Sequence, residues 1–489
     1  MNALGVCLAN GVPAALDTVP CVDVAAWRQW IIETCKGSTG RIVALFADAH
    51  GDRVRLYAII GMDLQHELWL AATEVCARAL HYPSLTPDLP EAHWFERELY
   101  EESGVVPQGH PWLKPLRTDR PYPFYRVDGE GIHEVAVGPV HAGIIEPGHF
   151  RFQCHGEKIF HLEIQLGYQH RGVESLLLQA PPARRAILAE SIAGDTVIGH
   201  MLAHAHVVEQ LAGRAIPARA EGLRVIALEL ERLANHVGDL GMLSADIGFL
   251  TAANYFGRLR GEFLNLLMAL TGNRYGRSFI RPGGVLLDLS RTEIAAFQKR
   301  LTRSAKEVQA VARLFFSATS VLDRLEQTGI VETTAAQALG LVGPAARASG
   351  LHRDVRHDYP TGDYRSSPFP LVRLTTGDVY ARARIRGLEV QHALDFLQRR
   401  LKSLPQEKIF LACGAAQPSA IIVSLVEGWR GEIAHVAITD RGGAFTRYKI
   451  VDPSFHNWMG LQIAMRGGQI SDFPLCNKSF NLSYAGHDL

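Results

Sequence analysis

Two kinds of hydrophobic pattern follow one another along the chain and divide it into regions. Short apolar, β-branched runs occupy 41–46 and 54–60, with the turn-forming residues Gly51 and Asp52 between them, which predicts a β-hairpin. The next segment, 67–81, places its apolar residues at helical spacing and predicts a helix. Up to about residue 85, the pattern therefore favours a small α+β unit.

A proline-rich segment follows. Eight of the 24 prolines lie between 83 and 125, with one compact helical stretch, 93–102, among them. Such a segment is typical of a linker or of an extended arm that wraps a neighbour. We place a domain boundary near residue 125, so that residues 1–125 form an α+β domain with a Pro-rich connecting arm and 126–489 form a second domain.

The second domain begins with strands and becomes helical. The patterns predict strands at 134–137, 149–154 and 159–166, and then long amphipathic helices at 184–211, 223–240, 252–270 and 291–325. A further helix is predicted at 385–402, strands at 409–411, 420–427, 432–439 and 446–451, and a last helix at 458–466 before an irregular tail. The predicted class is α+β, with a core of long antiparallel helices and peripheral β-strands.

Composition excludes several classes of protein. Lys plus Arg and Asp plus Glu both number 50, which argues against a general nucleic-acid binder. Apolar residues make up 47% of the 489, as in well-cored globular proteins. The longest apolar runs, such as 420–426, are far shorter than the about 18 residues of a membrane helix. The first residues lack a basic segment typical of secretion, so we expect a cytoplasmic protein that reaches a membrane only through partners.

The cysteines and histidines limit the metal chemistry of the chain. The seven cysteines include no Cys-x-x-Cys pair, which disfavours a Cys-rich zinc site or a cysteine-bound cluster held by this chain alone. His200 and His204 are one helical turn apart and would share a face, as a metal pair requires. Residue 201 is Met and not the Glu of a His-Glu-x-x-His motif. Hydrogen bonding in the core is the favoured reading and a metal pair the alternative.

Three Gly-rich loops concentrate polar groups. Residues 138–149 and 167–174 bracket the predicted hairpin 149–166, so their ends are expected to lie close together. A third, basic corner covers 273–277 and 281–284, between two predicted helices. Each loop is either a site or a structural turn, and the third is either an anion site or a solvated turn.

Taken together, these motifs resemble the large subunits of membrane-bound, energy-converting [NiFe]-hydrogenases and the related quinone-site subunit of respiratory complex I. The likeness spans nearly the whole chain. The segment 92–98 with Gly109-His110-Pro111 resembles the complex I accessory subunit that precedes the large subunit and is often fused to it. The remaining likeness lies in 138–152, 167–174, 281–285, 346–350 with Arg353-Asp354, and 377–382.

The chain departs from this family at the metal. The family's nickel–iron centre uses four thiolates from two Cys-x-x-Cys motifs, and the matching positions here are Ala193, Thr196, Ser454 and Asn457. Alanine offers no donor atom, and neutral oxygens are poor ligands for a soft, low-valent metal. We therefore expect no nickel–iron centre and no hydrogenase activity. The alternative is a different metal held by Asp195, Asp452 and His456.

The resemblance also implies a cavity, which takes the quinone headgroup in the complex I relatives. The His and Tyr that bind the quinone there correspond to positions near Pro147 and Gly194, so neither side chain is kept. Glu146 matches the glutamate that relays protons beside the metal in the hydrogenases; its alternative role is to cap a loop. The expected proton-handling residues are Glu146, His149, His170 and Asp195, and the expected quinone-pocket residues are His141 and Tyr168.

Two functions follow from the resemblance. The first is a subunit of a respiratory-type oxidoreductase complex related to hydrogenases and NADH:quinone oxidoreductases, and so to NAD-binding enzymes. Its electron- and proton-coupled cavity would be linked to ion translocation. This chain would itself hold no cofactor. A quinone is the candidate ligand of the cavity, and an iron–sulfur cluster would sit in a partner small subunit. The second function is a non-catalytic scaffold or conformational coupling subunit.

The resemblance further implies partners and a location. The expected partners are the iron–sulfur small subunit, a ferredoxin-like subunit and membrane-embedded subunits like those of complex I and its antiporter-like pumps. The expected location is the cytoplasmic side of the inner membrane, as a peripheral subunit. No nucleic-acid partner is expected.

Overall fold

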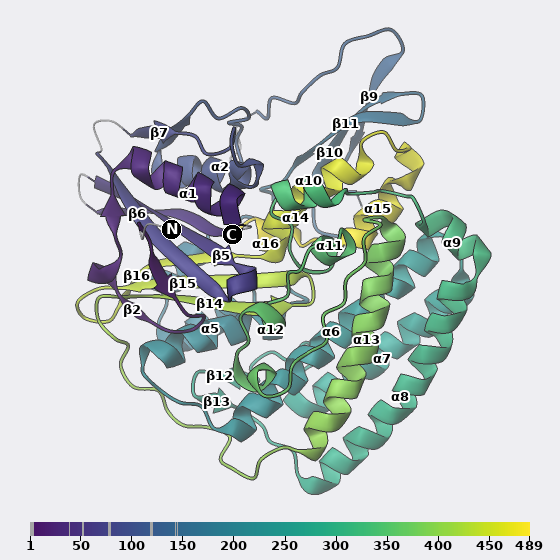
Figure 1. Cartoon of the computed structure of the whole chain (residues 1–489). Coiled ribbons are helices and arrows are strands. Elements are labelled where there is room, and N and C mark those ends of the chain that lie inside the picture. The colour runs from purple at the N-terminus through teal and green to yellow at the C-terminus, as the bar shows by residue number, and fades with distance from the viewer. Residues whose placement is uncertain are drawn as a thin grey trace.

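The computed structural model describes residues 4–38, 40–50, 53–76, 80–117, 121–141, 143 and 145–489 (Figure 1). The predicted turn at Gly51 and Asp52, and Ala142 of the first Gly-rich loop, lie outside these residues. Helices and strands are both abundant and are grouped in several sheets and one large helical part, which confirms the α+β class.

A sheet with one helix packed on it forms most of the N-terminal region. The sheet has the order β1-β6-β5-β4, and β3 pairs with β6 in parallel. The hairpin is confirmed as β4 and β5, but the predicted helix 67–81 is wrong, because Glu67–Cys76 is strand β6 and pairs with β5 along its whole length. The bounds are β1 Val6–Leu8, β3 Cys21–Val22, α1 Val24–Ser38, β4 Arg41–His50, β5 Arg53–Met62 and β6 Glu67–Cys76.

The Pro-rich arm is held by a helix inside it. Helix α2, His93–Ser103, confirms the predicted helical stretch, and β7, His81–Pro83, pairs in parallel with β8, Val106–Gln108. The buried carboxylate of Glu96 on α2 accepts hydrogen bonds from the backbone N–H of Leu85 at 2.7 Å and from the Ser84 hydroxyl at 2.6 Å. The arm is thereby fixed against the body of the protein.

Helices make up one end of the molecule. The long helices α6, α7, α8 and α13 form a four-helix bundle, in which α6 and α8 each contact both α7 and α13. The helix predicted at 184–211 is interrupted at 190–196, and the one predicted at 291–325 breaks at Ala318. The bounds are α3 Val173–Gln179, α4 Pro182–Ala189, α5 Val197–Leu211, α6 Ala218–Asp246, α7 Leu250–Thr271, α8 Arg291–Ser317, α9 Thr319–Leu325 and α13 Val379–Lys402.

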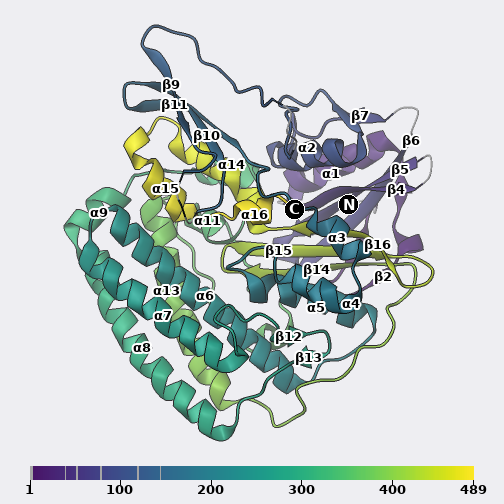
Figure 2. The ribbon, with the colours of Figure 1, turned by 180° about the vertical axis from the view of Figure 1, so that it is seen from behind.

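Two antiparallel sheets complete the second region. The predicted strands near its start are confirmed as the sheet β11-β10-β9, with β9 Ile132–Val137, β10 His149–His155 and β11 Lys158–Gln165. The other sheet has the order β16-β15-β14-β2, with β14 Ala420–Gly428, β15 Gly431–Thr439, β16 Phe445–Val451 and β2 Ala14–Ala15. Every residue of β14 and β15 is buried, so these two strands belong to the core and are not peripheral. Helices α3, α4 and α5 lie along one side of this sheet (Figure 2).

The C-terminal tail is ordered and not irregular. Helix α14, Pro453–Met465, is followed by α15, Phe473–Phe480, and α16, Tyr484–His487. The last residues are buried, and the Asp488 carboxylate accepts hydrogen bonds from the backbone N–H of Gly167 and Gln169. The predicted strand 409–411 forms only an isolated bridge, between Phe410 and Gly284. The shorter elements are β12 Ile280–Arg281, β13 Gly284–Val285, α10 Thr333–Ala338, α11 Gly343–Ala348 and α12 Val355–Asp358.

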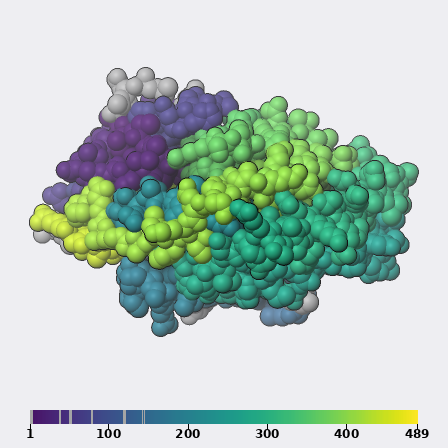
Figure 3. Space-filling view, turned by 90° about the horizontal axis from the view of Figure 1, so that it is seen from below, coloured from purple at the N-terminus to yellow at the C-terminus, as the bar shows by residue number. Residues whose placement is uncertain are grey.

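Buried contacts join the two regions. Strand β2 from the N-terminal region extends the β14 sheet, and Arg41 on β4 makes a two-pronged ion pair with Glu432 on β15, at 2.7 and 2.5 Å. Seen from below, the purple N-terminal residues lie toward one end of the molecule and the teal-green residues lie at the other (Figure 3). The division at residue 125 stays a prediction.

Candidate functional site

A polar cavity of about 430 Å³ lies where the predicted loops meet the C-terminal tail and the bundle. Its wall comes from the loop before β10, the interruption between α4 and α5, helices α6 and α7, and the segment between α15 and α16. The lining residues are Ile145, Glu146, Gly194, Asp195, Asn235, Gly238, Asp239, Met242, Arg260, Tyr275, Arg430, Asn481, Leu482, Ser483 and Tyr484. The volume is in the range of small-molecule sites.

One wall of the cavity is built by a tight hairpin. Strands β14 and β15 are joined by only Trp429 and Arg430, and Gly431, at φ +133°, closes the turn. The Trp429 indole N–H donates to the Asp195 carbonyl oxygen at 3.1 Å, and the Arg430 guanidinium stacks on the Trp429 ring at 3.8 Å. The turn between two fully buried strands thus places the Arg430 guanidinium at the cavity and fixes its position.

Arg430 and Asp195 form the central ion pair of the cavity. Two parallel hydrogen bonds, of 2.6 and 2.8 Å, join the guanidinium to the carboxylate. Burial by itself would raise the pKa of Asp195, but the charge and hydrogen bonds of Arg430 outweigh it and the pKa is lowered. Asp195 therefore stays ionised at neutral pH and serves as a fixed negative charge.

A second carboxylate, Asp239 on α6, lies in the same wall. Its oxygens accept hydrogen bonds from Arg386 Nε at 2.7 Å and from the Asn481 amide at 2.6 Å. Burial raises the pKa of this carboxyl despite the Arg386 charge. The side chain of Arg260 on α7 crosses α6 at Gly238, where a Cβ atom would come within 2.9 Å of Arg260 Cδ. The absence of a side chain at Gly238 thus lets Arg260 reach the cavity.

Glu146 lies at the loop side of the cavity and is half-buried. One carboxylate oxygen accepts a hydrogen bond from the backbone N–H of Ala485 at 3.0 Å. Next to it, the Tyr484 hydroxyl is 3.2 Å from His141 Nε2. Burial raises the pKa of the Tyr484 phenol and lowers that of His141, so both groups are neutral at pH 7. Of the predicted residues, Glu146 and Asp195 line the cavity, and His141 contacts it through Tyr484.

The other predicted residues lie away from the cavity wall. His149 Nδ1 is 3.2 Å from the Gly138 carbonyl oxygen, and its ring packs on Phe124. Tyr168 is 43% exposed. His170 is also exposed, and its Nδ1 lies 3.4 Å from the Asp488 carbonyl oxygen. Gly194, near which the resemblance puts the expected quinone-binding Tyr, lines the cavity.

Of the two segments that would carry metal ligands, 193–196 contributes Gly194 and Asp195 to the cavity wall, and 454–457 reaches the cavity only through the contact of Ser454 with Ser483. Ser454 Oγ accepts a hydrogen bond from the backbone N–H of Ser483, which lines the cavity. The Asn457 side-chain amide is hydrogen-bonded to the backbone of Val342. It accepts from the Val342 N–H at 3.0 Å and donates to the Val342 carbonyl at 3.1 Å. The Thr196 hydroxyl accepts from Trp429 Nε1 at 3.1 Å.

These contacts decide how well the residues suit a nickel–iron centre. Three of the four ligand positions hold side chains that already hydrogen-bond within the protein, and the fourth is the buried Ala193. A thiolate-bound metal needs soft, deprotonated, free donors. The residues present do not fit such a centre.

The donors named for a different metal are engaged as well. Asp195 pairs with Arg430, and Asp452 accepts a hydrogen bond from the backbone N–H of Ser454 at 2.7 Å and lies 3.0 Å from His200 Nε2. The His456 ring is buried against Phe95, and burial lowers the pKa of His456 to about 3. This set does not assemble around a common point in the cavity wall, since His456 is not among the lining residues.

His200 and His204 belong to a buried hydrogen-bonded line. From Asp452 the line runs to His200, from there to His435 at 3.2 Å, then to the Tyr448 hydroxyl at 3.0 Å and finally to His204 at 2.9 Å. All five side chains are at most 1% exposed. Burial lowers the pKa of His204 to about 4, so its ring is neutral. The predicted role of these histidines in core hydrogen bonding is confirmed.

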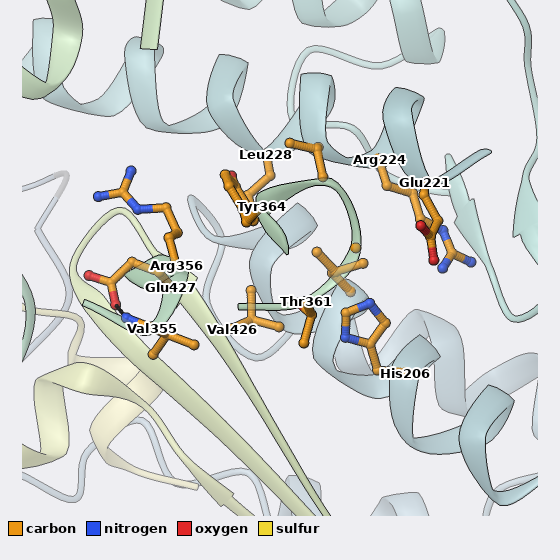
Figure 4. Close-up of a pocket in the computed structure, with 13 residues that line it drawn as sticks. His206, Glu221, Arg224, Leu228, Val355, Arg356, Thr361, Tyr364, Val426 and Glu427 are labelled. Carbon is orange, nitrogen blue, oxygen red and sulfur yellow. Dashed lines mark hydrogen bonds between the residues drawn. The ribbon is translucent and has the colours of Figure 1, made fainter. Parts of the chain in front are cut away.

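A second, much smaller pocket lies beside α6 (Figure 4). Arg356 and Glu427 lie on one side of it, and Glu221, Arg224 and His206 lie on the other. Its volume of about 20 Å³ admits a water molecule and excludes a cofactor or substrate. We therefore take the 430 Å³ cavity as the candidate site.

Several cavity residues escaped sequence reasoning. Arg430 carried no signal, because its role depends on a hairpin that is 235 residues from Asp195 in sequence. Asp239 and Arg260 lie inside predicted helices, where charged residues usually face solvent. The only available hint was the Gly428 to Gly431 spacing, which marks a two-residue hairpin turn.

Comparison with known protein families and proteins shows which family the chain belongs to. The model of the 49 kDa subunit of the respiratory-chain NADH dehydrogenase matches residues 246–412 and 408–488, and that of the 30 kDa subunit matches 36–128. Formate hydrogenlyase subunit 5 of Escherichia coli is 30% identical over 465 residues, which cover 88% of this chain and 81% of that protein. This chain is a member of the family of large subunits shared by membrane-bound hydrogenases and complex I.

Two further relatives span the family. The membrane-bound hydrogenase subunit alpha of Pyrococcus furiosus is 28% identical, over 71% of this chain and 85% of that protein. NADH-quinone oxidoreductase subunit 4 of Thermus thermophilus is 29% identical, over 69% of this chain and 89% of that protein. The expected membership, including a fused accessory-subunit-like part, is confirmed. Among the described residues, no helix is long and apolar enough to cross a membrane.

Proposed function

We propose that this chain is the large subunit of a membrane-associated oxidoreductase complex, that it holds no nickel–iron centre, and that its cavity handles protons coupled to electron transfer. One observation carries the proposal. The four positions that would bind the metal are occupied by Ala193 and by three side chains whose donors are committed to Trp429, Ser483 and Val342. The cavity itself is retained, with charged groups in its wall.

Glu146 is the proposed proton-transfer group. It is half-buried at the loop side of the cavity. Among the described residues, the backbone N–H of Ala485 is the one hydrogen-bond donor to its carboxylate, so the second oxygen can take or give a proton. Asp195 and Arg430 provide a fixed dipole across the wall, since their two hydrogen bonds lock both side chains. His141 and Tyr484 are neutral donors next to Glu146. His149, His170 and Tyr168 have no part in this scheme.

A quinone is the proposed acceptor. The cavity volume of about 430 Å³ suits a headgroup, and Arg260, Tyr275 and Tyr484 line it as hydrogen-bond donors. One relative is named as an NADH-quinone oxidoreductase subunit, which supports the same class of acceptor. An iron–sulfur small subunit would supply the electrons. A ferredoxin-like subunit and membrane-embedded, antiporter-like subunits would complete the complex on the cytoplasmic face of the inner membrane.

A scaffold or conformational coupling subunit is the second candidate. The observation that favours it is the pairing of the cavity charges within the protein, because Asp195 and Asp239 already have arginine partners. Such a wall is stable without any substrate. The two candidates differ in whether Glu146 takes part in turnover.

The first test is the nickel and iron content of the natively purified complex, by mass spectrometry. We expect no nickel, and iron only at the level of the partner clusters. Near-stoichiometric nickel would refute the proposal. The second test is quinone reduction by complexes carrying Glu146→Gln or, as a matched control, Glu157→Gln in the exposed turn before β11. We expect at least a tenfold loss for Glu146→Gln alone. Equal rates in both variants would favour the scaffold.

A further inference from the structure

Two histidines and an aspartate gather in the segment that follows α11 and includes the short helix α12. They are His352, His357 and Asp358, and one ligand atom from each lies within 4.8 Å of the other two. In the described part of the chain, this is the one such group of three His, Cys, Asp or Glu side chains. None of the three residues lines the polar cavity or the small pocket beside α6. The cluster is therefore separate from the candidate site.

The distances within this cluster match those around a metal ion. Asp358 Oδ1 lies 3.2 Å from His357 Nδ1 and 3.4 Å from His352 Nδ1. Nitrogen and oxygen ligands of a tetrahedral zinc ion lie about 2.0–2.1 Å from the metal and hence about 3.3 Å from one another. His352 Nδ1 makes no hydrogen bond within the described chain despite its short distance to Asp358. Such a pair of atoms is typical of two ligands directed at a shared point between them.

The charge of Asp358 lacks a permanent counter-ion. Its side chain is 2% exposed, and among the described residues its only ion-pair partners are the two histidines, which carry a charge only when protonated. Asp354, by contrast, pairs with Arg356 at 2.6 Å and Arg347 at 3.3 Å. Burial and the nearby charge of Asp63 raise the pKa of Asp358 to about 7, which reflects the cost of this unbalanced carboxylate. A divalent cation at the cluster would remove that cost.

The cluster is both oriented and open to solvent. The second oxygen of Asp358 accepts a hydrogen bond from the backbone N–H of Asp354 at 2.8 Å, which turns Oδ1 towards the histidines. The side chains of His352 and His357 are 30% and 42% exposed. Neighbouring atoms cover His352 Nδ1 itself. Rotation of the exposed His357 ring, whose centroid is 4.8 Å from that of His352, would let an ion enter between the three ligand atoms.

We propose that His352, His357 and Asp358 bind one divalent transition-metal ion, Zn²⁺, with water as the fourth ligand. Two imidazoles and one carboxylate favour zinc over magnesium and calcium, which prefer oxygen ligands alone. The expected role is structural. His66, directly before β6 in the N-terminal sheet, has its Nδ1 2.7 Å from the Asp358 carbonyl oxygen, so a bound ion would stabilise this contact between the two regions. The inference does not rest on the function proposed for the polar cavity.

The test uses the full chain without a histidine tag, freed of metal with EDTA and titrated with Zn²⁺ by calorimetry at about pH 7.5. We expect one Zn²⁺ per chain with a Kd below about 50 µM, and no competition from millimolar Mg²⁺. His352→Gln and His357→Gln, which each remove one imidazole, should weaken Zn²⁺ binding at least tenfold. His133→Gln, on the exposed face of β9, is the matched control and should change the Kd less than twofold.

Two further measurements support the same test. Asp358→Asn keeps an oxygen for the Asp354 N–H and removes the charge, and should weaken Zn²⁺ more than either histidine variant; if it fails to fold, the histidine variants still decide. In the unmodified chain, Zn²⁺ should slow hydrogen exchange in 63–67 and 352–358. The proposal is overturned if the Kd exceeds about 50 µM, if His357→Gln and His133→Gln bind Zn²⁺ alike, or if millimolar Mg²⁺ displaces the ion.

Discussion

The polar cavity differs from a second, aromatic pocket of about 230 Å³, which lies between the Pro-rich arm and helix α14 and is lined by Trp94, Trp112 and Tyr122 among others. In the polar cavity, Asp195 and Asp239 are paired with arginines and Glu146 holds a backbone N–H. In the aromatic pocket, three ring nitrogens lack partners within the described chain. The first cavity is thus a preorganised wall that is stable when it contains only water. In the second, the unpartnered nitrogens of His93, Trp94 and His161 are buried by neighbouring atoms. The wall of the first is organised by charge pairs and that of the second by packed aromatic rings.

The largest effect is expected when the central ion pair of the polar cavity is broken. Arg430→Met leaves the Asp195 carboxylate without its partner, and we expect the free energy of unfolding to fall by about 3 kcal/mol. The value lies at the low end for buried pairs because Asp195 partly faces the cavity. Urea titration measures it. The double variant Asp195→Asn, Arg430→Met should recover part of the loss, and no recovery would show that the pair does not set the stability of the wall.

A smaller loss is expected at Asn457, which stands at one of the four positions that match metal ligands. Asn457→Ala removes both hydrogen bonds to Val342 and leaves its buried backbone N–H unpaired, while its carbonyl keeps only the long hydrogen bond from the Ala346 N–H at 3.4 Å. We expect a loss of about 2 kcal/mol in the free energy of unfolding. Asn457→Ser, which keeps one polar group, should lose less. Equal losses for the two variants would mean that packing and not hydrogen bonding fixes this residue.

His93, which lines the aromatic pocket, should make the free energy of unfolding depend on pH. Burial lowers the pKa of His93 well below its usual value of about 6.5, so the folded protein keeps this ring neutral while the unfolded chain takes up a proton. Stability is therefore full above pH 6.5 and falls as the pH decreases below it. For one such histidine, the loss between pH 7 and pH 5.5 is about 1 kcal/mol.

His93→Phe should remove that share of the acid-induced loss and leave the contributions of the other buried histidines. His133→Gln, on the exposed face of β9, is the control and should leave the slope unchanged. The measurement is urea unfolding at pH 7 and pH 5.5. Identical pH slopes for the unmodified chain and His93→Phe would contradict the assignment of a buried, neutral ring at this position.

Local pattern predicted most elements and failed where contacts with another segment decide. The segment 67–76 has leucines and alanines that suit a helix, but pairing with β5 over its whole length makes it a strand. The helix predicted at 184–211 is interrupted at 190–196, where Gly194 and Asp195 form part of the cavity wall. Both errors come from tertiary contacts that a single segment does not encode.

The candidate site was only partly predictable, because contacts between segments far apart in sequence also build it. Asp195 and Glu146 were identified through motif positions, and both line the cavity. Arg430, Asn481 and Tyr484 were not, because a hairpin turn and the C-terminal tail bring them in from more than 200 residues away. The aromatic pocket gave no signal in the sequence, since its walls combine the Pro-rich arm with α14.

The smallest effect on stability is expected at Gly238, where the polar cavity depends on a missing side chain. Gly238→Ala adds a Cβ atom 2.9 Å from Arg260 Cδ, and that flexible side chain can move. The gain in helix propensity, about 1 kcal/mol, should offset the displacement, so stability should change by less than about 0.5 kcal/mol. The position of Arg260 in the cavity should nevertheless shift, and quinone reduction by the complex should fall.

Gly343→Ala is the variant to compare with Gly238→Ala, because Gly343 packs against the backbone of the Arg430 hairpin. Gly343 has φ +63°, and a Cβ atom there would lie 2.2 Å from the Arg430 carbonyl oxygen, which is backbone and cannot yield. This variant should lose stability far more than Gly238→Ala. If the two variants lose similar free energies of unfolding in urea, Arg260 is held as rigidly as the hairpin backbone. Both sides of the polar cavity would then be fixed.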